Sequence, residues 1–205
     1  MAIGLSQSGL LPVAAMTDAP LSDEEKRLLL RLAREAIEAA VNRRPLPPLD
    51  WETLPPRLRE PGATFVTLTR RGQLRGCIGA LEAYQPLAED VREHAIAAAL
   101  EDFRFPPVRP EEVPELKIEI SRLTPLRPLE YETPEELVRK LRPGVDGVVI
   151  RDGFRRATFL PQVWEKLPDP VRFLDNLCIK MGAPRNLWRT KKLDVFVYQV
   201  EEFHE

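Results

Sequence analysis

The order of the expected elements is the feature that most limits how this chain can fold. Two β-hairpins are predicted, over residues 64–79 and 148–160, and helices flank each of them. Proline-rich connections near residues 122–134 separate the two hairpins. A doubly wound sheet would need strands and helices in regular βαβ alternation, which this order lacks. We therefore predict an α+β protein of two lobes, with antiparallel sheets packed against helices.

Local signals mark the ends of these elements. Ser22 and Glu25 have the spacing of a capping box, and apolar residues then recur on one face, which predicts an amphipathic helix over residues 22–43. The other elements carry similar signals: a helix opened by Pro86, a half-buried strand at 116–120, a helix capped by Thr133, a helix from Asp169, and a last strand at 195–201.

The lobes are assigned from these elements, since the N-terminal helix and the last strand fit best in the same lobe. Residues 1–20 are expected to form an N-terminal extension. The larger lobe is predicted to contain residues 21–121 plus about 166–205. The smaller lobe is predicted to contain about residues 122–165.

The first hairpin contains the hexapeptide LRGCIG, Leu74–Gly79, which holds one of the two cysteines of the chain. Alternate side chains of a strand point to opposite faces of the sheet. One face is therefore expected to carry three motif residues, Leu74, Gly76 and Ile78. The other face is expected to carry the remaining three, Arg75, Cys77 and Gly79. If the leucine and the isoleucine face the core, Arg75 and Cys77 point outward together.

This parity gives the motif a chemical interpretation. A guanidinium about 7 Å along the same face, two residues of strand rise away, favours thiolate over thiol at Cys77. Gly76 and Gly79 mark a place where a ligand or another backbone approaches closely. The sequence leaves the alternative open that Cys77 is a buried structural cysteine.

A second group of polar residues lies in the loop 102–107, just beyond the predicted second helix. Asp102 and Arg104 flank Phe103, and the run Phe105-Pro106-Pro107 holds the following backbone extended. These charged groups are candidates for orienting a ligand. The alternative is a local ion pair and helix cap.

The two histidines limit acid–base schemes. His94 borders the apolar face of its predicted helix, so a packed helix residue is favoured over a catalytic base, with a Cys77–His94 dyad as the alternative. Cys178 is interpreted as a core thiol. We expect no metal site, because the cysteines and histidines lack the short paired spacings of zinc ligands. No phosphate loop, dinucleotide fingerprint or HExxH motif occurs, so we expect no cofactor of these classes.

Composition predicts a soluble cytoplasmic protein. No window approaches about 18 consecutive apolar residues, so no membrane span is expected. No lysine or arginine precedes Lys26, so the basic region of a signal peptide is missing, and two cysteines provide no disulfide framework. The net charge is −2, which argues against nucleic-acid binding. Arginine clusters, such as Arg70, Arg71 and Arg75, leave RNA as an alternative partner.

Four motifs occur in a fixed order: LRGCIG at 74–79, DFRFPP at 102–107, FLPQVWE at 159–165 and LCIKMG at 177–182. In this set the chain resembles the AMMECR-domain family, also called AmmeMemoRadiSam system protein A, over about residues 21–203. The resemblance implies a cytoplasmic, two-lobed α+β protein in which LRGCIG lines a cleft between the lobes. Phe103 departs from the family pattern, where a small residue or proline is expected.

The resemblance also implies partners, a Memo-like protein and a radical S-adenosylmethionine protein. We therefore predict an enzyme or enzyme subunit acting on an unknown small molecule, with Cys77 and Arg75 as catalytic residues. Ligand contacts are expected from the rest of the two motifs: Leu74, Gly76, Ile78, Gly79, Asp102, Arg104 and Phe105. Two alternatives stay open, a non-catalytic adaptor that presents LRGCIG to these partners and an RNA-binding protein.

Overall fold

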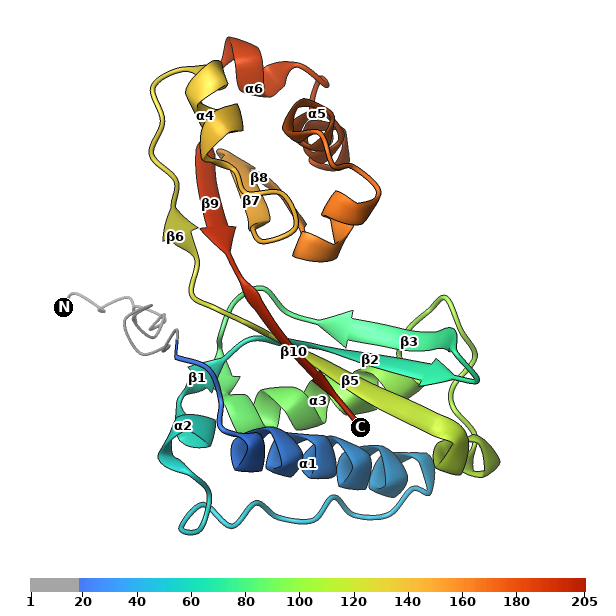
Figure 1. Ribbon diagram of the computed structural model, residues 1–205. Helices are drawn as coiled ribbons and strands as arrows, with labels where there is room; N and C mark the ends of the chain where they lie inside the picture. The colour runs from blue at the N-terminus through green and yellow to red at the C-terminus, as the bar shows by residue number, and fades with distance from the viewer. Residues whose placement is uncertain (1–18) are drawn as a thin grey trace, which may run out of the picture. The chain divides into compact units, whose positions relative to one another are not determined.

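The structure, a computed structural model, describes residues 19–205, which form two compact units (Figure 1). The first unit contains the described residues up to Arg122 together with Glu202–Glu205, and the second contains Leu123–Glu201. Of the N-terminal extension predicted at residues 1–20, residues 1–18 lie outside the described part of the chain. Within residues 19–205, no helix is both long enough and apolar enough to cross a bilayer.

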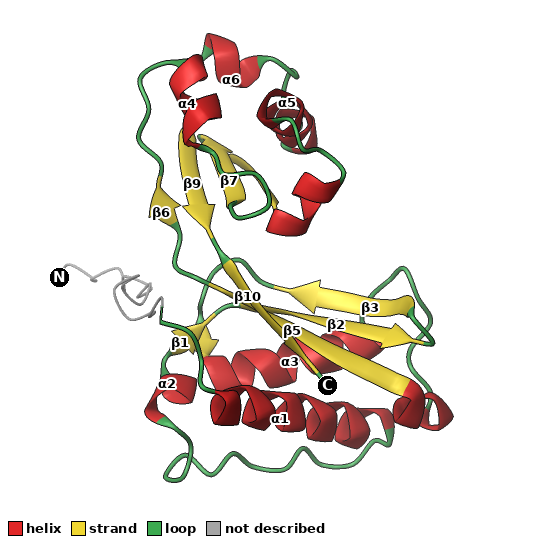
Figure 2. Ribbon diagram, in the orientation of Figure 1, coloured by secondary structure: helices red, strands yellow, loops and turns green. Residues whose placement is uncertain are grey.

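The first unit is a four-stranded sheet with two long helices on one face (Figure 2). The strand order is β10-β5-β2-β3, and β2 pairs antiparallel with both β3 and β5. The elements of this unit are α1 (Asp23–Val41), α2 (Pro56–Arg59), β1 (Pro61–Gly62), β2 (Thr64–Arg70), β3 (Gln73–Gly79), β4 (Gln85–Pro86), α3 (Leu87–Leu100), the 3₁₀ helix η2 (Pro110–Glu115), β5 (Leu116–Leu123) and β10 (Val200–His204). One end of β5 and one end of β10 extend past the boundary into the second unit.

Capping and amphipathicity account for α1. The Ser22 hydroxyl accepts a hydrogen bond from the Glu25 N–H at 3.2 Å, and the Glu25 carboxylate accepts one from the Ser22 N–H at 2.7 Å. The predicted capping box is therefore confirmed. Apolar side chains of α1 and α3 pack on the inner face of the sheet in one core, which includes Leu29, Ala33, Ile37, Val66, Leu68, Val91, Ala95, Ile118 and Ile120.

The second unit is a four-stranded antiparallel sheet in the order β6-β9-β7-β8. Its elements are β6 (Arg127–Pro128), α4 (Pro134–Lys140), β7 (Gly147–Asp152), β8 (Arg155–Phe159), the 3₁₀ helix η3 (Pro161–Glu165), α5 (Pro170–Lys180), α6 (Leu187–Thr190) and β9 (Asp194–Tyr198). Its core includes the stacked rings of Trp164 and Phe173, whose centroids lie 3.7 Å apart. Cys178 is fully buried in the same core, as expected.

The predicted α+β fold with antiparallel sheets is confirmed. The last strand, expected at 195–201, is two strands instead, because β9 pairs with β7 in the second unit whereas β10 lies beside β5 in the first. The division of the chain also differs from the expected one. Most of residues 166–205 falls in the second unit, because α5 packs on β8 and β9 joins the sheet of that unit.

Candidate functional site

The LRGCIG motif forms most of β3, and its register against β2 contains a β-bulge. Cys77 lies opposite Thr67, Gly76 opposite Leu68, and Leu74 opposite Thr69. Arg75 has no partner position on β2, so it is the extra residue of the bulge. One extra residue reverses the alternation of faces for the part of the strand that precedes it.

This bulge overturns the predicted grouping of side chains. Directly opposite residues of an antiparallel pair share a face, so Leu74 lies with Cys77 and not with Gly76. Leu74 is accordingly 44% exposed, so the condition that the leucine faces the core is not met. The prediction that Arg75 and Cys77 project together was wrong, because the Arg75 side chain reaches Glu112 of η2 instead.

Gly76 and Ile78 face the helix side of the sheet. A Cβ added to Gly76 would lie 2.0 Å from the carbonyl oxygen of Ala98 in α3, so only glycine allows this approach of strand and helix. Ile78 is partly buried against the core, and Gly79 packs closely on the Phe65 ring. These three residues position the strand by close packing.

The Cys77 thiol is half-buried and has two polar neighbours. The Thr67 hydroxyl donates a hydrogen bond to Cys77 Sγ at 3.3 Å. Arg104 Nη2 donates to the Cys77 carbonyl oxygen at 3.2 Å. The hydrogen bond that Arg104 donates to Asp102 is the main cause that raises the pKa of Arg104, and the Cys77 side chain makes a smaller contribution to this increase. The cation that contacts Cys77 is therefore Arg104, and not Arg75.

Asp102 holds this arrangement together. Its buried carboxylate accepts hydrogen bonds from the Cys77 N–H at 2.9 Å and from Arg104 Nε and Nη2 at 2.9 and 2.6 Å. The hydrogen bonds from the Arg104 side chain are the largest cause that keeps the pKa of Asp102 well below its ordinary range. Because β3 is an edge strand, Asp102 and Arg104 supply Cys77 with the backbone partners that a further strand would provide.

Backbone hydrogen bonds hold the loop after α3 where it carries these groups. The Phe105 N–H donates to the Asp102 carbonyl at 3.0 Å, which closes a turn, and the Arg104 guanidinium lies 5.5 Å from the centre of the Phe105 ring. The Val108 N–H then bonds the Ala99 carbonyl. Phe103 is 95% exposed between the two charged residues, so its departure from the family pattern leaves the turn intact.

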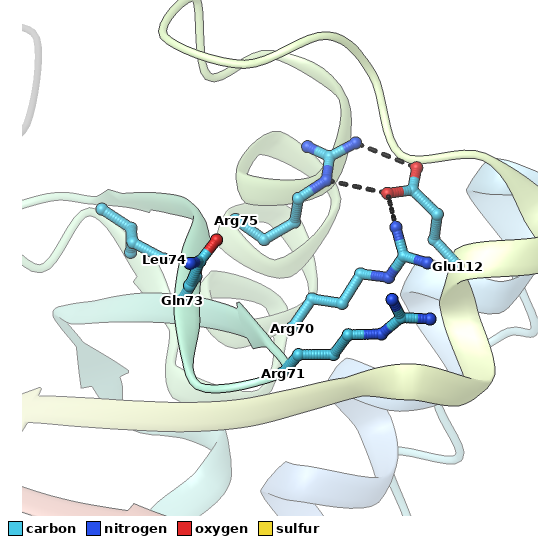
Figure 3. Close-up of a pocket in the computed structure, with 6 residues that line it drawn as sticks. All are labelled: Arg70, Arg71, Gln73, Leu74, Arg75 and Glu112. Carbon is cyan, nitrogen blue, oxygen red and sulfur yellow. Dashed lines mark hydrogen bonds and ion pairs between the residues drawn. The ribbon is translucent and has the colours of Figure 1, made fainter.

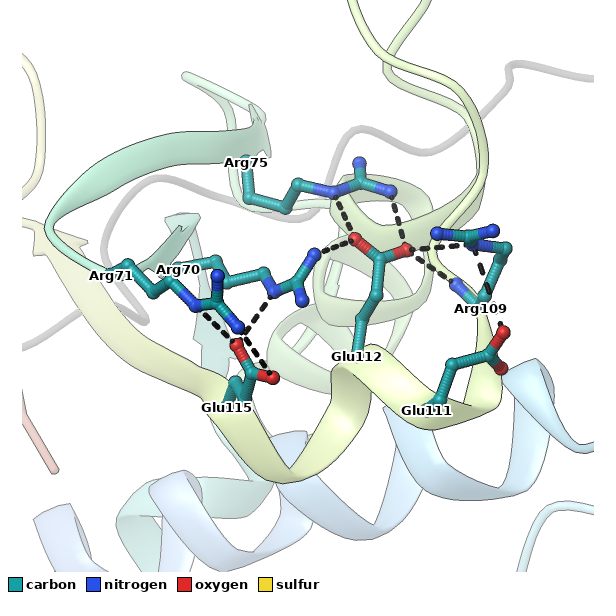
Figure 4. A network of polar contacts seen from close by, with 7 residues as sticks. All are labelled: Arg70, Arg71, Arg75, Arg109, Glu111, Glu112 and Glu115. Carbon is teal, nitrogen blue, oxygen red and sulfur yellow. Dashed lines mark hydrogen bonds and ion pairs between the residues drawn. The ribbon is translucent and has the colours of Figure 1, made fainter.

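Arg75 belongs to a second polar cluster on the hairpin, centred on Glu112 (Figure 4). The Glu112 carboxylate accepts two hydrogen bonds from Arg75, at 3.1 and 3.0 Å, and one from Arg70 at 3.0 Å. The backbone N–H of Arg109 also donates to it. The Arg75 hydrogen bonds are the largest cause that lowers the pKa of Glu112, to about 2.

Replacing Glu112 with glutamine is expected to lower the free energy of unfolding by about 2 kcal/mol at pH 7, because buried guanidinium groups lose a charged partner. The folded-state pKa of Glu112 is depressed from its ordinary 4.5 to about 2, so this contribution is present above about pH 4.5 and is lost toward pH 2. The stability gap between wild type and variant therefore narrows on acidification. Urea denaturation at pH 7 and pH 3 measures it.

The neighbouring Glu111→Gln variant is the matched control, because the Glu111 side chain is 69% exposed and its contact with Arg109 spans 3.9 Å. It is expected to change stability by less than about 0.5 kcal/mol. Equal losses in the two variants, or a gap for Glu112→Gln that stays constant with pH, would contradict the assigned role of Glu112.

His94 does not pair with Cys77, so the alternative of a Cys77–His94 dyad is wrong. His94 is buried on α3 and its Nδ1 lies 3.2 Å from Asp90 Oδ2. Asp90 also accepts the Thr64 hydroxyl at 2.6 Å. Thr64 precedes Thr67 by an odd number of strand positions, so this buried group lies on the opposite face of β2 from the thiol.

Thr67 and Glu112 are members of these clusters that the sequence did not indicate. Thr67 had no reliable signal, because a regular hairpin would pair it with Gly76, and only the bulge at Arg75 places it opposite Cys77. Glu112 had none, since it is 37 residues from Arg75 in the chain. Within the described residues, no three histidine, cysteine, aspartate or glutamate side chains are grouped as metal ligands.

Comparison with known proteins gives a consistent result. The AMMECR1 family model matches residues 30–203. A protein of Methanothermobacter thermautotrophicus is 42% identical over 195 residues, covering 93% of this chain and 99% of the relative. A protein of Thermofilum pendens is 42% identical over 202 residues, covering 90% and 92%. The crystal structure of the uncharacterized protein PH0010 from Pyrococcus horikoshii matches with a TM-score of 0.79 and 38% identity, covering 90% of this chain and 93% of that one.

Proposed function

This chain belongs to the AMMECR1 family. We propose that it is an enzyme or enzyme subunit whose reactive group is the thiol of Cys77 in the LRGCIG motif. The partners in this proposal are the Memo-like and radical S-adenosylmethionine proteins that the sequence resemblance implies. The substrate is a small molecule with an electrophilic centre that a thiolate attacks.

The single observation that supports a reactive thiol is the set of donors around its sulfur. The Thr67 hydroxyl donates to Sγ, and the Arg104 guanidinium donates to the carbonyl oxygen of the same residue. Both groups stabilise negative charge that develops on sulfur. Asp102 acts as a positioning residue, because its carboxylate fixes the Arg104 side chain and the Cys77 N–H together. Arg104 thus takes the electrostatic role that the sequence suggested for Arg75.

An adaptor function is the second candidate, and the exposed ring of Phe103 favours it. This ring stands between Asp102 and Arg104, where a partner protein would contact it together with the motif. RNA binding receives less support. The hairpin arginines that suggested it each bond a glutamate, so they do not form an extended uncompensated basic surface.

Cys77 is expected to react with iodoacetamide in the folded protein while Cys178 stays unmodified. In this reaction the sulfur forms a bond to carbon, iodide leaves, and the thiol proton passes to solvent. Cys77 is half-buried, whereas Cys178 is fully buried and its burial raises the pKa of its thiol. Mass spectrometry of the two cysteine peptides over time measures both rates.

Arg104→Gln is expected to slow alkylation of Cys77 about three- to tenfold, because a neighbouring cation is removed. Arg31→Gln, which changes the same charge on an exposed part of α1, should leave the rate unchanged. Equal rates in both variants would remove the electrostatic role of Arg104. In a system reconstituted with the two partner proteins, turnover that survives Cys77→Ala unchanged would exclude a catalytic thiol and leave the adaptor.

A further inference from the structure

A pocket of about 270 Å³ lies against the β2–β3 hairpin (Figure 3). The residues that line it are Arg70, Arg71, Gln73, Leu74, Arg75 and Glu112. Pockets for drug-sized molecules enclose about 300–1,000 Å³, so this one suits a smaller ligand. Half of its lining residues carry a guanidinium group, which indicates a ligand with negative charge.

The charges of the cluster do not balance. Glu112 bonds Arg75 and Arg70, while Glu115 bonds Arg70 and Arg71, so two carboxylates serve three guanidinium groups (Figure 4). Arg109 contacts both Glu112 and Glu111 at longer distances of 3.8 and 3.9 Å. Including Arg109 and Glu111 in the cluster adds one positive and one negative charge. One positive charge is therefore in excess at the pocket.

Hydrogen-bond donors are also in excess. Each of the three guanidinium groups uses two of its three nitrogens on glutamate oxygens. The third nitrogen of Arg75, Nη1, is buried and makes no hydrogen bond with any described residue. The forks of Arg71 and Arg75 are occupied by glutamates, so an oxygen of a phosphate group would bond the guanidinium nitrogens that these carboxylates leave unused.

We propose that this pocket binds the phosphate group of a small phosphorylated molecule. A phosphate group carries enough acceptor oxygens to serve several guanidinium groups at once, and its negative charge is attracted by the excess positive charge. The bulge at Arg75 turns this side chain away from Cys77, so the pocket is a site separate from the thiol. The proposal therefore goes beyond the proposed function and does not depend on it.

The test is a titration of the full chain with inorganic phosphate at constant ionic strength, followed by the backbone amide NMR signals of Gln73 and Leu74. Saturable shifts with a Kd of about 1 mM or below are expected. Arg71→Gln should weaken binding about five- to tenfold, because it removes one charge-assisted hydrogen bond. Glu115→Gln should strengthen it several-fold, because it removes a competing carboxylate.

Arg31→Gln is the matched control and should leave the Kd unchanged. The opposite signs expected for Arg71→Gln and Glu115→Gln separate a binding role from general damage to the hairpin, which could only weaken binding. Absence of saturable shifts at these amides, or equal Kd values in all three variants, would overturn the proposal. So would an RNA oligonucleotide without terminal phosphate that binds more tightly than glycerol 3-phosphate, since the ligand would then be a polynucleotide.

Discussion

Replacing Gly76 with alanine is expected to lower the stability of the first unit by about 3 kcal/mol or more. The new Cβ would lie 2.0 Å from the Ala98 carbonyl oxygen and 3.0 Å from its carbon. Both atoms belong to the backbone of α3, so the clash cannot be relieved by rotating a side chain. The helix must move away from the sheet, and the core between them loses contacts. Hydrogen exchange of the β2 amides measures the loss.

Gly72→Ala is the control for this experiment. Gly72 lies in the turn between β2 and β3 with a φ of +76°, and an added Cβ would have nothing within 4 Å. Its substitution is expected to cost only the backbone strain of a left-handed residue, about 1 kcal/mol. If Gly76→Ala costs no more than Gly72→Ala, the close approach of β3 and α3 is not a constraint on the fold.

Removal of the Asp102 side chain is expected to have the next largest effect. Asp102→Ala should lower the free energy of unfolding by about 3 kcal/mol at pH 7, because the Cys77 N–H and the Arg104 guanidinium lose their shared acceptor. Asp102→Asn keeps an oxygen for the Cys77 N–H and should cost less, about 2 kcal/mol. The difference in free energy of unfolding between the two variants separates the contribution of the hydrogen bond to the Cys77 N–H from that of the negative charge.

The pH dependence of these variants follows from the direction of the Asp102 pKa. Its folded-state pKa is depressed, chiefly by the hydrogen bond from Arg104, so its stabilisation is present above the ordinary value of 3.8. It is lost as the pH falls through the folded-state value. The deficit of Asp102→Asn relative to wild type should therefore shrink in acid, as measured by urea denaturation. A deficit that is absent at pH 7, or that does not shrink, would contradict the role of Asp102.

The sequence was sufficient for the elements whose signals are local. The capping box at Ser22, the N-cap at Thr133 and the proline that opens α3 each set an element boundary through neighbouring residues. The alternating strand before residue 121 was predicted for the same reason, because its pattern depends only on which face is buried.

Features set by distant contacts could not be predicted in this way. The bulge at Arg75 depends on the packing of Gly76 against Ala98 and on the position of Glu112, which no residue of LRGCIG specifies. The pairing of Arg104 with Cys77 joins residues 27 apart. The sequence therefore named the members of the candidate site correctly in part, as Cys77, Asp102 and Arg104 do lie together, but assigned the neighbouring cation to the wrong arginine.

The chain enters the second unit near Thr124 and leaves it near Gln199, and these two segments are neighbours. The Thr124 N–H donates to the Gln199 carbonyl at 2.9 Å, and the Gln199 N–H donates to the Thr124 hydroxyl at 2.8 Å. The second unit is thus an insertion whose entry and exit are hydrogen-bonded to each other. During synthesis, β10 leaves the ribosome only after the whole insertion, so β5 remains a temporary edge of the first unit's sheet until the insertion has been made.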